Sequence, residues 1–199
     1  MQEILVATSN LGKLQAITSV LEDCDIKLLS LADVFINFEN FIEDGKTFEE
    51  NAIKKAKFAY EKCKIPIIAD DSGIIVDALI GELGVKTRRW GAGETVTDAE
   101  WVEYFLNRMK NFSNKKAKFV SSIAFYDGIN EKIFTGQVDG TITEKLMAPI
   151  TKGLPLSSCF IPNGANDVFT NLSLDYKIKF GHREKALNML KTFFKKSGF

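Results

Sequence analysis

Two adjacent carboxylates follow directly on an apolar run in the first half of the chain. The run is Ile65-Pro66-Ile67-Ile68, and the segment 69–73 that follows it reads Ala-Asp-Asp-Ser-Gly. The run predicts a buried strand, and two carboxylates at its end would repel each other in a dry environment. A solvated Asp-Asp-Ser-Gly turn would relieve that repulsion. A magnesium-type site would relieve it too, because Mg²⁺ takes one or two carboxylates together with substrate phosphates.

The residues around this strand predict a β-α-β-α-β opening. Short strands are expected over residues 4–7, 26–31 and 65–69, with a helix from Leu14 after the first strand. A sharp bend is expected at Ser72-Gly73. Thr47 and Glu50 form a capping-box pattern, in which Glu50 reaches back to the N-cap backbone. The helix that they begin carries a face of small residues: Ala52, Ala56, Ala59 and Cys63.

The second half of the chain predicts paired strands followed by a terminal helix. A second capping box begins at Thr97, and residues 119–126 alternate as a strand does. Asp127-Gly128 and Asp139-Gly140 both carry hairpin-turn signals, and the last helix begins at about Arg183. The pattern predicts an α/β protein with a mixed sheet, one domain over residues 1–199, in two lobes with a cleft between them.

The charge balance, the length of the apolar runs and the cysteines limit which binding partners and which cellular compartment are expected. The 26 basic and 26 acidic residues balance, so no bulk attraction to nucleic acid or to a membrane is expected. No apolar run approaches the roughly 20 residues of a membrane span. Three scattered cysteines, with no zinc-type spacing among them, suit a reducing compartment. The N-terminal residues do not resemble a signal peptide, and a cytoplasmic protein is expected.

Two further segments carry side chains suited to an anionic ligand, and a third is acidic. Residues 8–13 (Thr-Ser-Asn-Leu-Gly-Lys) offer hydroxyls, helix N–H groups and a lysine, as a phosphate cradle or as a simple capped helix start. An acidic stretch over 37–46 contains Glu39, Glu43 and Asp44. The single histidine, His182, precedes a basic residue, and together they form a basic cluster or a surface pair. P-loop, Gly-x-Ser-x-Gly and Gly-x-Gly-x-x-Gly fingerprints are absent from the sequence.

Taken in order, these motifs resemble the inosine/xanthosine triphosphate pyrophosphatase family, enzymes that remove non-canonical purine nucleotides. The resemblance covers nearly the whole chain, and its most specific blocks are Thr-Phe-Glu-Glu-Asn-Ala over 47–52 and Ala-Asp-Asp-Ser-Gly over 69–73. The other matching residues are Thr8, Ser9, Asn10, Lys13, Glu43, Lys55, Ala56, Val76, Asp77, Ala78, Leu79, Gly81, Gly84, Val85, Gly136, Gly140, Ile142, the segment 160–165, Lys177, His182 and Arg183.

The resemblance implies an elongated α/β fold with a central mixed sheet, an active-site cleft between two lobes, and a homodimer. It implies cleavage of a nucleoside triphosphate between the α and β phosphates, giving a monophosphate and pyrophosphate with Mg²⁺. Glu43 and Asp71 would hold Mg²⁺ with Asp70 close by, and Asp71 would help to activate the attacking water. The expected phosphate-binding residues are Thr8, Ser9, Asn10, Lys13 and Ser72. Lys177, His182 and Arg183 would face the nucleotide, and the last two would read a keto-bearing base.

The segment that would form a wall of the base pocket departs from the family pattern. The family has Gly-Phe-Gly-Tyr-Asp-Pro where this chain has residues 153–158, Gly-Leu-Pro-Leu-Ser-Ser. Leu154 replaces the stacking aromatic and Ser157 replaces the acidic residue, while Gly181 replaces the serine that normally precedes His-Arg. Stacking on an aromatic contributes about 1–3 kcal/mol per base. We therefore expect the phosphate half of the site to be kept and the base specificity to be altered or relaxed.

Other functions fit parts of the pattern. A pyrophosphatase of the related family that acts on pyrimidine or modified nucleotides fits the opening and acidic motifs less well. A nucleotide-binding module without turnover is a second alternative, although a binder has no need to keep the metal carboxylates. A nucleic-acid-binding protein has little support, because no basic stripe interleaved with aromatic residues is present.

Overall fold

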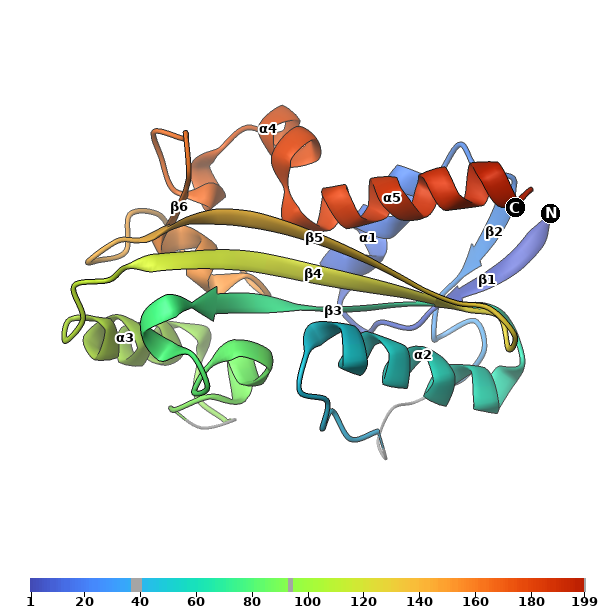
Figure 1. Cartoon of the computed structure of the whole chain (residues 1–199), viewed down its shortest axis with the longest axis horizontal. Coiled ribbons are helices and arrows are strands. Elements are labelled where there is room, and N and C mark those ends of the chain that lie inside the picture. The colour runs from blue at the N-terminus through green and yellow to red at the C-terminus, as the bar shows by residue number, and fades with distance from the viewer. Residues whose placement is uncertain (37–40, 93–94, 199) are drawn as a thin grey trace. The chain divides into compact units, whose positions relative to one another are not determined.

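The computed structural model describes residues 1–36, 41–92 and 95–198 (Figure 1). Within them, strands and α-helices alternate through the first half, and paired strands and two helices fill most of the second. The strands are β1 (Gln2–Val6), β2 (Ile26–Leu29), β3 (Ile67–Val76), β4 (Lys116–Tyr126), β5 (Glu131–Ile142) and β6 (Phe160–Pro162). The helices are α1 (Leu11–Leu21), α2 (Phe48–Cys63), α3 (Asp98–Met109), α4 (Leu174–Phe180) and α5 (His182–Ser197).

The strands form one mixed sheet in the order β2-β1-β3-β4-β5-β6. β1 pairs in parallel with both β2 and β3, and β5 pairs antiparallel with β6. The predicted α/β class with a mixed sheet is therefore confirmed. The chain divides into two compact units: the first comprises residues 1–72, 121–136 and 182–199, and the second comprises residues 73–120 and 137–181. The cleft expected between two lobes stays a prediction.

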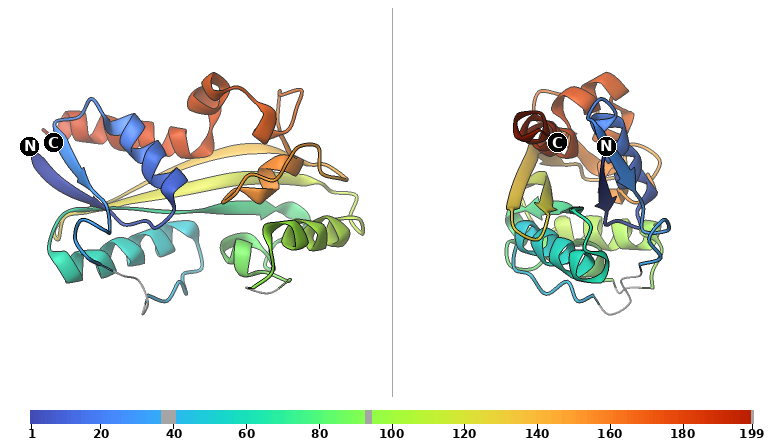
Figure 2. Two further views of the ribbon diagram at one scale, coloured as in Figure 1. Left: turned by 180° about the vertical axis from the view of Figure 1, so that it is seen from behind. Right: turned by 90° about the vertical axis from the view of Figure 1, so that its right-hand side faces the viewer.

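In the first unit, helices cover both faces of the sheet. α1 and α5 lie side by side on one face, and α2 lies on the other (Figures 1 and 2). Ile17 and Leu21 of α1 pack with Leu187 and Leu190 of α5 in one buried cluster. The small side chains of α2 form a second cluster with the opposite face of the strands, and the alanines at 52, 56 and 59 are fully buried there. The predicted small-residue face of α2 is confirmed.

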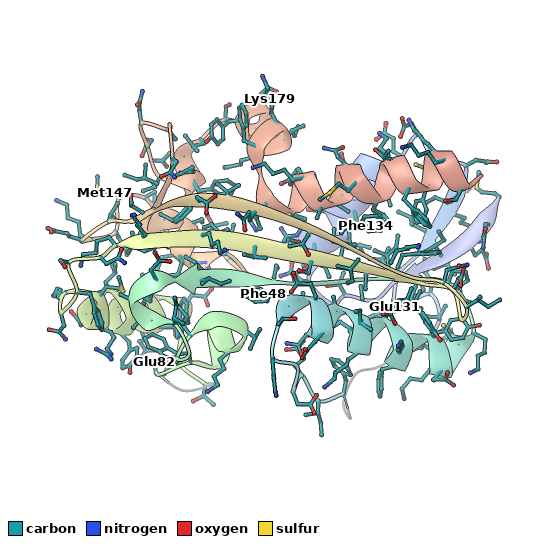
Figure 3. The ribbon with its side chains drawn as sticks, in the orientation of Figure 1. Phe48, Glu82, Glu131, Phe134, Met147 and Lys179 are labelled. Carbon is teal, nitrogen blue, oxygen red and sulfur yellow. The ribbon has the colours of Figure 1, made fainter. Side chains whose placement is uncertain are left out.

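The start of α2 differs from the predicted capping box in one contact. The Thr47 hydroxyl accepts a hydrogen bond from the Glu50 N–H (3.1 Å), as an N-cap does. The Glu50 carboxylate instead accepts from the Lys46 N–H (2.7 Å), one residue before the cap. Phe48, labelled in Figure 3, is the first helical residue and is buried. The second capping box, at Thr97 and Glu100, is confirmed in both of its contacts.

Strand β3 is longer than predicted and runs through the Asp-Asp-Ser-Gly segment. The expected bend at Ser72-Gly73 is wrong, because extended backbone continues to Val76. Asp139-Gly140 was likewise wrong as a turn, since both residues lie inside β5. A Cβ at Gly140 would stand 2.3 Å from the Ile161 carbonyl oxygen, so this glycine serves the close approach of β5 and β6. The hairpin turn at Asp127-Gly128 is confirmed.

The second unit has an aromatic core of its own. Trp101 and Phe105 of α3 are fully buried and pack in one cluster with Phe119 and Phe160. The rings of Phe119 and Phe160 meet edge to face, with centroids 4.6 Å apart. The same cluster holds Leu156 and Cys159 of a short 3₁₀ helix, Pro155–Cys159. None of the described helices is long and apolar enough to cross a membrane.

Candidate functional site

Asp70 is a buried carboxylate that holds two cationic side chains. It lies in β3 and is 1% exposed. Lys13 of α1 forms an ion pair with Oδ1, and the Nε of Arg183 in α5 lies 3.1 Å from Oδ2. The Ser121 hydroxyl of β4 donates to the same Oδ2 at 2.8 Å. Burial by itself would raise the pKa of Asp70, but Lys13 and Arg183 outweigh it and hold that pKa well below its usual range.

Asp71, the next residue, has the opposite electrostatic environment. Burial raises the pKa of its carboxyl, and Lys55 and Lys13 oppose that rise only in part. Oδ1 accepts from the Ser72 N–H at 3.1 Å. Oδ2 is buried and meets no hydrogen-bond partner within the described part of the chain. Adjacent positions on one strand thus hold one firmly ionised carboxylate and one whose environment favours taking up a proton.

Glu43 approaches this carboxylate from the loop that precedes α2. The Lys55 ammonium of α2 lies 2.8 Å from Glu43 Oε1, and it also donates to the Asp70 carbonyl oxygen at 3.4 Å. Glu43 raises the pKa of Asp71, as a nearby like charge does. Residues 37–40 of the acidic stretch, including Glu39, lie outside the described residues.

The expected phosphate cradle over residues 8–13 forms the start of α1. The helix begins at Leu11, three residues before the predicted Leu14, because the Asn10 side chain caps it. Asn10 Oδ1 accepts from the N–H groups of Gly12 (2.9 Å) and Lys13 (3.1 Å). Thr8 Oγ1 in turn accepts from the Asn10 N–H at 3.2 Å, and Ser9 is exposed. The phosphate-binding roles of Thr8, Ser9 and Asn10 stay predictions.

The first turn of α5 presents Arg183 to the two β3 side chains. Besides its contact with Asp70, Arg183 donates from Nη2 to Ser72 Oγ at 3.1 Å. His182 is buried, and burial together with the Arg183 charge lowers the pKa of its imidazole to about 3. Gly136 of β5 lies against this turn, since a Cβ there would stand 2.1 Å from the His182 carbonyl oxygen. The expected role of His182 and Arg183 toward the base stays a prediction.

Three further residues expected at the nucleotide, Leu154, Ser157 and Lys177, belong to the second unit. Leu154 is half-buried against the aromatic core, and Ser157 is buried. Ser157 Oγ lies 2.6 Å from both the Leu154 carbonyl oxygen and Thr170 Oγ1. Lys177 Nζ donates to the Thr170 carbonyl oxygen at 2.8 Å. Ser157 and Lys177 are thus both hydrogen-bonded to Thr170. The nucleotide contacts of these residues and of Leu154 stay predictions.

The acidic residues of the first unit fit a divalent cation with few protein ligands. Glu43 lies close enough to Asp71 to raise the pKa of its carboxyl, and Asp71 Oδ2 is buried with no hydrogen-bond partner among the described residues. Across the described residues, no three histidine, cysteine or acidic side chains gather as a metal-binding group. That donor set suits Mg²⁺, which takes one or two carboxylates and completes its shell with water and phosphate. Asp70, whose oxygens meet Lys13, Arg183 and Ser121, stays a predicted metal ligand only.

Four residues of these networks were not predicted as site residues: Lys55, Ser121, Thr170 and Asn51, whose side chain lies near enough to Asp71 to lower its pKa. Asn51 and Lys55 stand in the motif of α2, so the sequence offered a signal for them. Ser121 contacts Asp70 across 51 positions of the chain, and no local pattern encodes that pairing. Thr170 is likewise recognisable only from the contacts of its neighbours.

Comparison with known proteins places the whole chain among relatives of one kind. The model of the Ham1 family matches residues 4–193. The dITP/XTP pyrophosphatase of Leptospira interrogans is 35% identical over 194 residues, which cover 98% of each chain. That of Geobacter sulfurreducens is 36% identical over 194 residues, 96% of each chain.

Solved structures agree with this assignment. A HAM1 protein from Coxiella burnetii superposes with a TM-score of 0.89 at 29% identity, covering 98% of this chain and 100% of that one. The Ham1 protein of Staphylococcus aureus gives a TM-score of 0.87 at 31% identity, with the same coverage. Pyrophosphatases of this family typically need a divalent cation. The family match and the relatives show that the chain belongs to the Ham1 family.

Proposed function

We propose that this protein is a nucleoside triphosphate pyrophosphohydrolase that converts non-canonical purine nucleotides such as dITP, ITP and XTP into the monophosphate and pyrophosphate. The observation that carries the proposal is the contrast between Asp70 and Asp71. Neighbouring carboxyl groups whose environments drive their pKa values in opposite directions are typical of acid–base sites. The names of the relatives, dITP/XTP pyrophosphatases, support the same reaction.

In this proposal Asp71 takes the proton of the attacking water. The water oxygen forms a bond to the α-phosphorus, and the bond from that phosphorus to the bridging oxygen breaks, releasing pyrophosphate. A raised pKa makes the Asp71 carboxylate a better proton acceptor than an ordinary surface aspartate. Glu43 and Asp71 would hold Mg²⁺, which supplies positive charge and makes a bound water more acidic.

The cationic side chains of the first unit would neutralise the triphosphate. Lys13 and Arg183 are already oriented by Asp70, and Lys55 is oriented by Glu43. Preorganised charges of this kind stabilise a phosphoryl transition state without having to reorient during the reaction. Ser72 holds Arg183 from the other side and would support the same phosphate contacts.

We further propose that the protein is a homodimer and that it acts in the cytoplasm. The resemblance supports a homodimer, which analytical ultracentrifugation would test. The three cysteines at 24, 63 and 159 are free thiols, and this favours a reducing compartment such as the cytoplasm.

Release of pyrophosphate tests the activity. The purified protein with Mg²⁺ should hydrolyse dITP, ITP and XTP, and rates on dUTP, UTP and the canonical triphosphates would measure how far the changed segment 153–158 relaxes the choice of base. Asp71→Asn should lower the rate by about 10³-fold, because it removes the proton acceptor and weakens the cation site. A protein that releases no pyrophosphate from any of these nucleotides, or an Asp71→Asn variant as active as the wild type, would contradict the proposal.

A further inference from the structure

Asn51 is a fully buried polar side chain in the first turns of α2. It is the fourth residue of the helix, three positions after the Phe48 labelled in Figure 3, and it is 0% exposed. An amide removed from water needs partners for its oxygen and its nitrogen, and each group left without one destabilises the fold. The buried residues that follow it on α2 are alanines, so the polar contacts of the amide, and not packing alone, distinguish this position.

One end of the amide holds the loop that carries Glu43. Asn51 Oδ1 accepts a hydrogen bond from the Gly45 N–H at 2.8 Å. The contact is so close that a Cβ at Gly45 would stand 2.4 Å from Oδ1. Because Gly45 lies two residues after Glu43, this bond fixes the backbone from which the Glu43 carboxylate extends.

The other end of the amide faces Asp71. Asn51 Nδ2 and Asp71 Oδ2 are both buried, and neither meets a partner at full hydrogen-bond geometry in the described ranges of the chain. The Asn51 side chain nevertheless lies near enough to lower the pKa of Asp71, against the effect of burial. A small movement would complete the bond, and Oδ1, which accepts from the Ser72 N–H at 3.1 Å, would keep a second lone pair for a cation.

We propose that Asn51 is a positioning residue that ties the Glu43 loop and the Asp71 side chain to one buried amide and so sets the spacing at which the two carboxylates bind a divalent cation together. The inference rests on the proposed function, since it assigns both carboxylates to the cation. It adds a residue that touches neither the nucleotide nor the cation. Partners that orient metal ligands in this way typically change metal affinity by about 10–100-fold when they are removed.

Titration with Mn²⁺ alone, followed by the electron paramagnetic resonance signal of the free ion, tests the inference without any nucleotide. Asn51→Ala should bind Mn²⁺ about tenfold more weakly than the wild type. In the pyrophosphate assay the same variant should need about tenfold more Mg²⁺ for half its maximal rate, and the rate should recover at saturating Mg²⁺. Thr47→Ala is the matched control, because it removes the N-cap of the same helix and leaves both ends of the Asn51 amide in place. Its Mn²⁺ affinity should stay within twofold of the wild type.

Gly45→Ala is an independent probe of the same contact, since the added methyl group would push the Asn51 oxygen away. Gly45→Ala should also weaken Mn²⁺ binding. It replaces Asn51→Ala in the titration if circular dichroism shows that Asn51→Ala does not fold. Mn²⁺ affinity within twofold of wild type in the folded variants, or an equal loss in Thr47→Ala, would overturn the inference, as would a wild type that binds no Mn²⁺. Failure to hydrolyse any nucleotide would instead overturn the proposed function, because the titration requires no turnover.

Discussion

The two units build their polar interiors from different chemistry. In the first unit, the buried Asp70 holds Lys13 and Arg183 through charge, with Ser121 as the neutral partner. In the second unit, the buried side chains of Ser157 and Ser158 meet Thr170 through hydroxyl contacts alone, at 2.6 and 3.1 Å. Charges resist rearrangement because a broken pair leaves an uncompensated ion, whereas hydroxyls can exchange partners at small cost. We infer that the buried polar residues of the first unit tolerate little change and that those of the second unit tolerate more.

Asp70→Asn should have the largest effect on stability. The substitution keeps the shape of the side chain but leaves Lys13 and Arg183 without their buried counter-charge, which costs about 3–5 kcal/mol. Urea unfolding at pH 7 measures this loss. Asp23→Asn is the control, because Asp23 pairs with Lys191 and Lys195 at the surface and its loss should leave the urea midpoint nearly unchanged. Equal midpoints for the two variants would remove the distinction between buried and exposed charge.

The pH dependence of stability should also originate in the first unit. The pKa of His182 is about 3 in the folded protein and near 6.5 in the unfolded chain, so the unfolded chain binds more protons between these values. Stability is therefore lost as the pH falls below about 6.5, by about 1.4 kcal/mol for each pH unit. Below about pH 4 the depressed pKa of Asp70 adds a second loss, because protons then favour the unfolded carboxyl.

Urea midpoints measured from pH 7 to pH 4 would check this slope. His182→Gln should flatten it in the upper part of that range, and a slope equal to that of the wild type would show that His182 titrates in the fold as it does in the unfolded chain. The hydroxyl cluster of the second unit contains no group that titrates in this range, so Thr170→Val should keep the slope of the wild type.

Leu154→Phe would sharpen the comparison by testing whether the second unit takes part in binding the base. If Leu154 lines the base pocket, the new ring should lower the KM for ITP by about tenfold, which corresponds to about 1.4 kcal/mol. Inorganic tripolyphosphate, which has no base, should inhibit the variant and the wild type equally. A KM for ITP that does not change would place Leu154 outside the base site.

Thr170→Val should have the smallest effect. Ser157 and Ser158 each keep a carbonyl partner at 2.6 Å, on Leu154 and Pro149, so the loss in unfolding free energy should be about 1 kcal/mol. Thr192→Val, which removes a hydroxyl at an exposed position of α5, provides the comparison for a loss without burial. A loss above about 3 kcal/mol would show that the hydroxyl cluster is as rigid as the charged one.

Local patterns predicted the elements, and long-range contacts decided where some of them end. The alanine face of α2 and the Thr97 capping box follow from spacing along one helix, and both were predicted. The Asp-Asp-Ser-Gly segment has the composition of a turn, yet cations from α1 and α5 let its carboxylates remain in an extended strand. That compensation comes from residues 57 and 113 positions away, so no window around Asp70 could have disclosed it.

The first turn of α5 packs directly against β5 at Gly136, and this affects how mutations in this protein are interpreted. Position 136 carries no side chain, and any added atom would displace the backbone of the turn that begins with His182. Arg183 would then be carried out of line with Asp70 and Ser72, although neither the arginine nor its partners had changed. A variant at Gly136 would therefore show the same defect as a variant at Arg183, and a survey restricted to chemically reactive residues would attribute it to the wrong position.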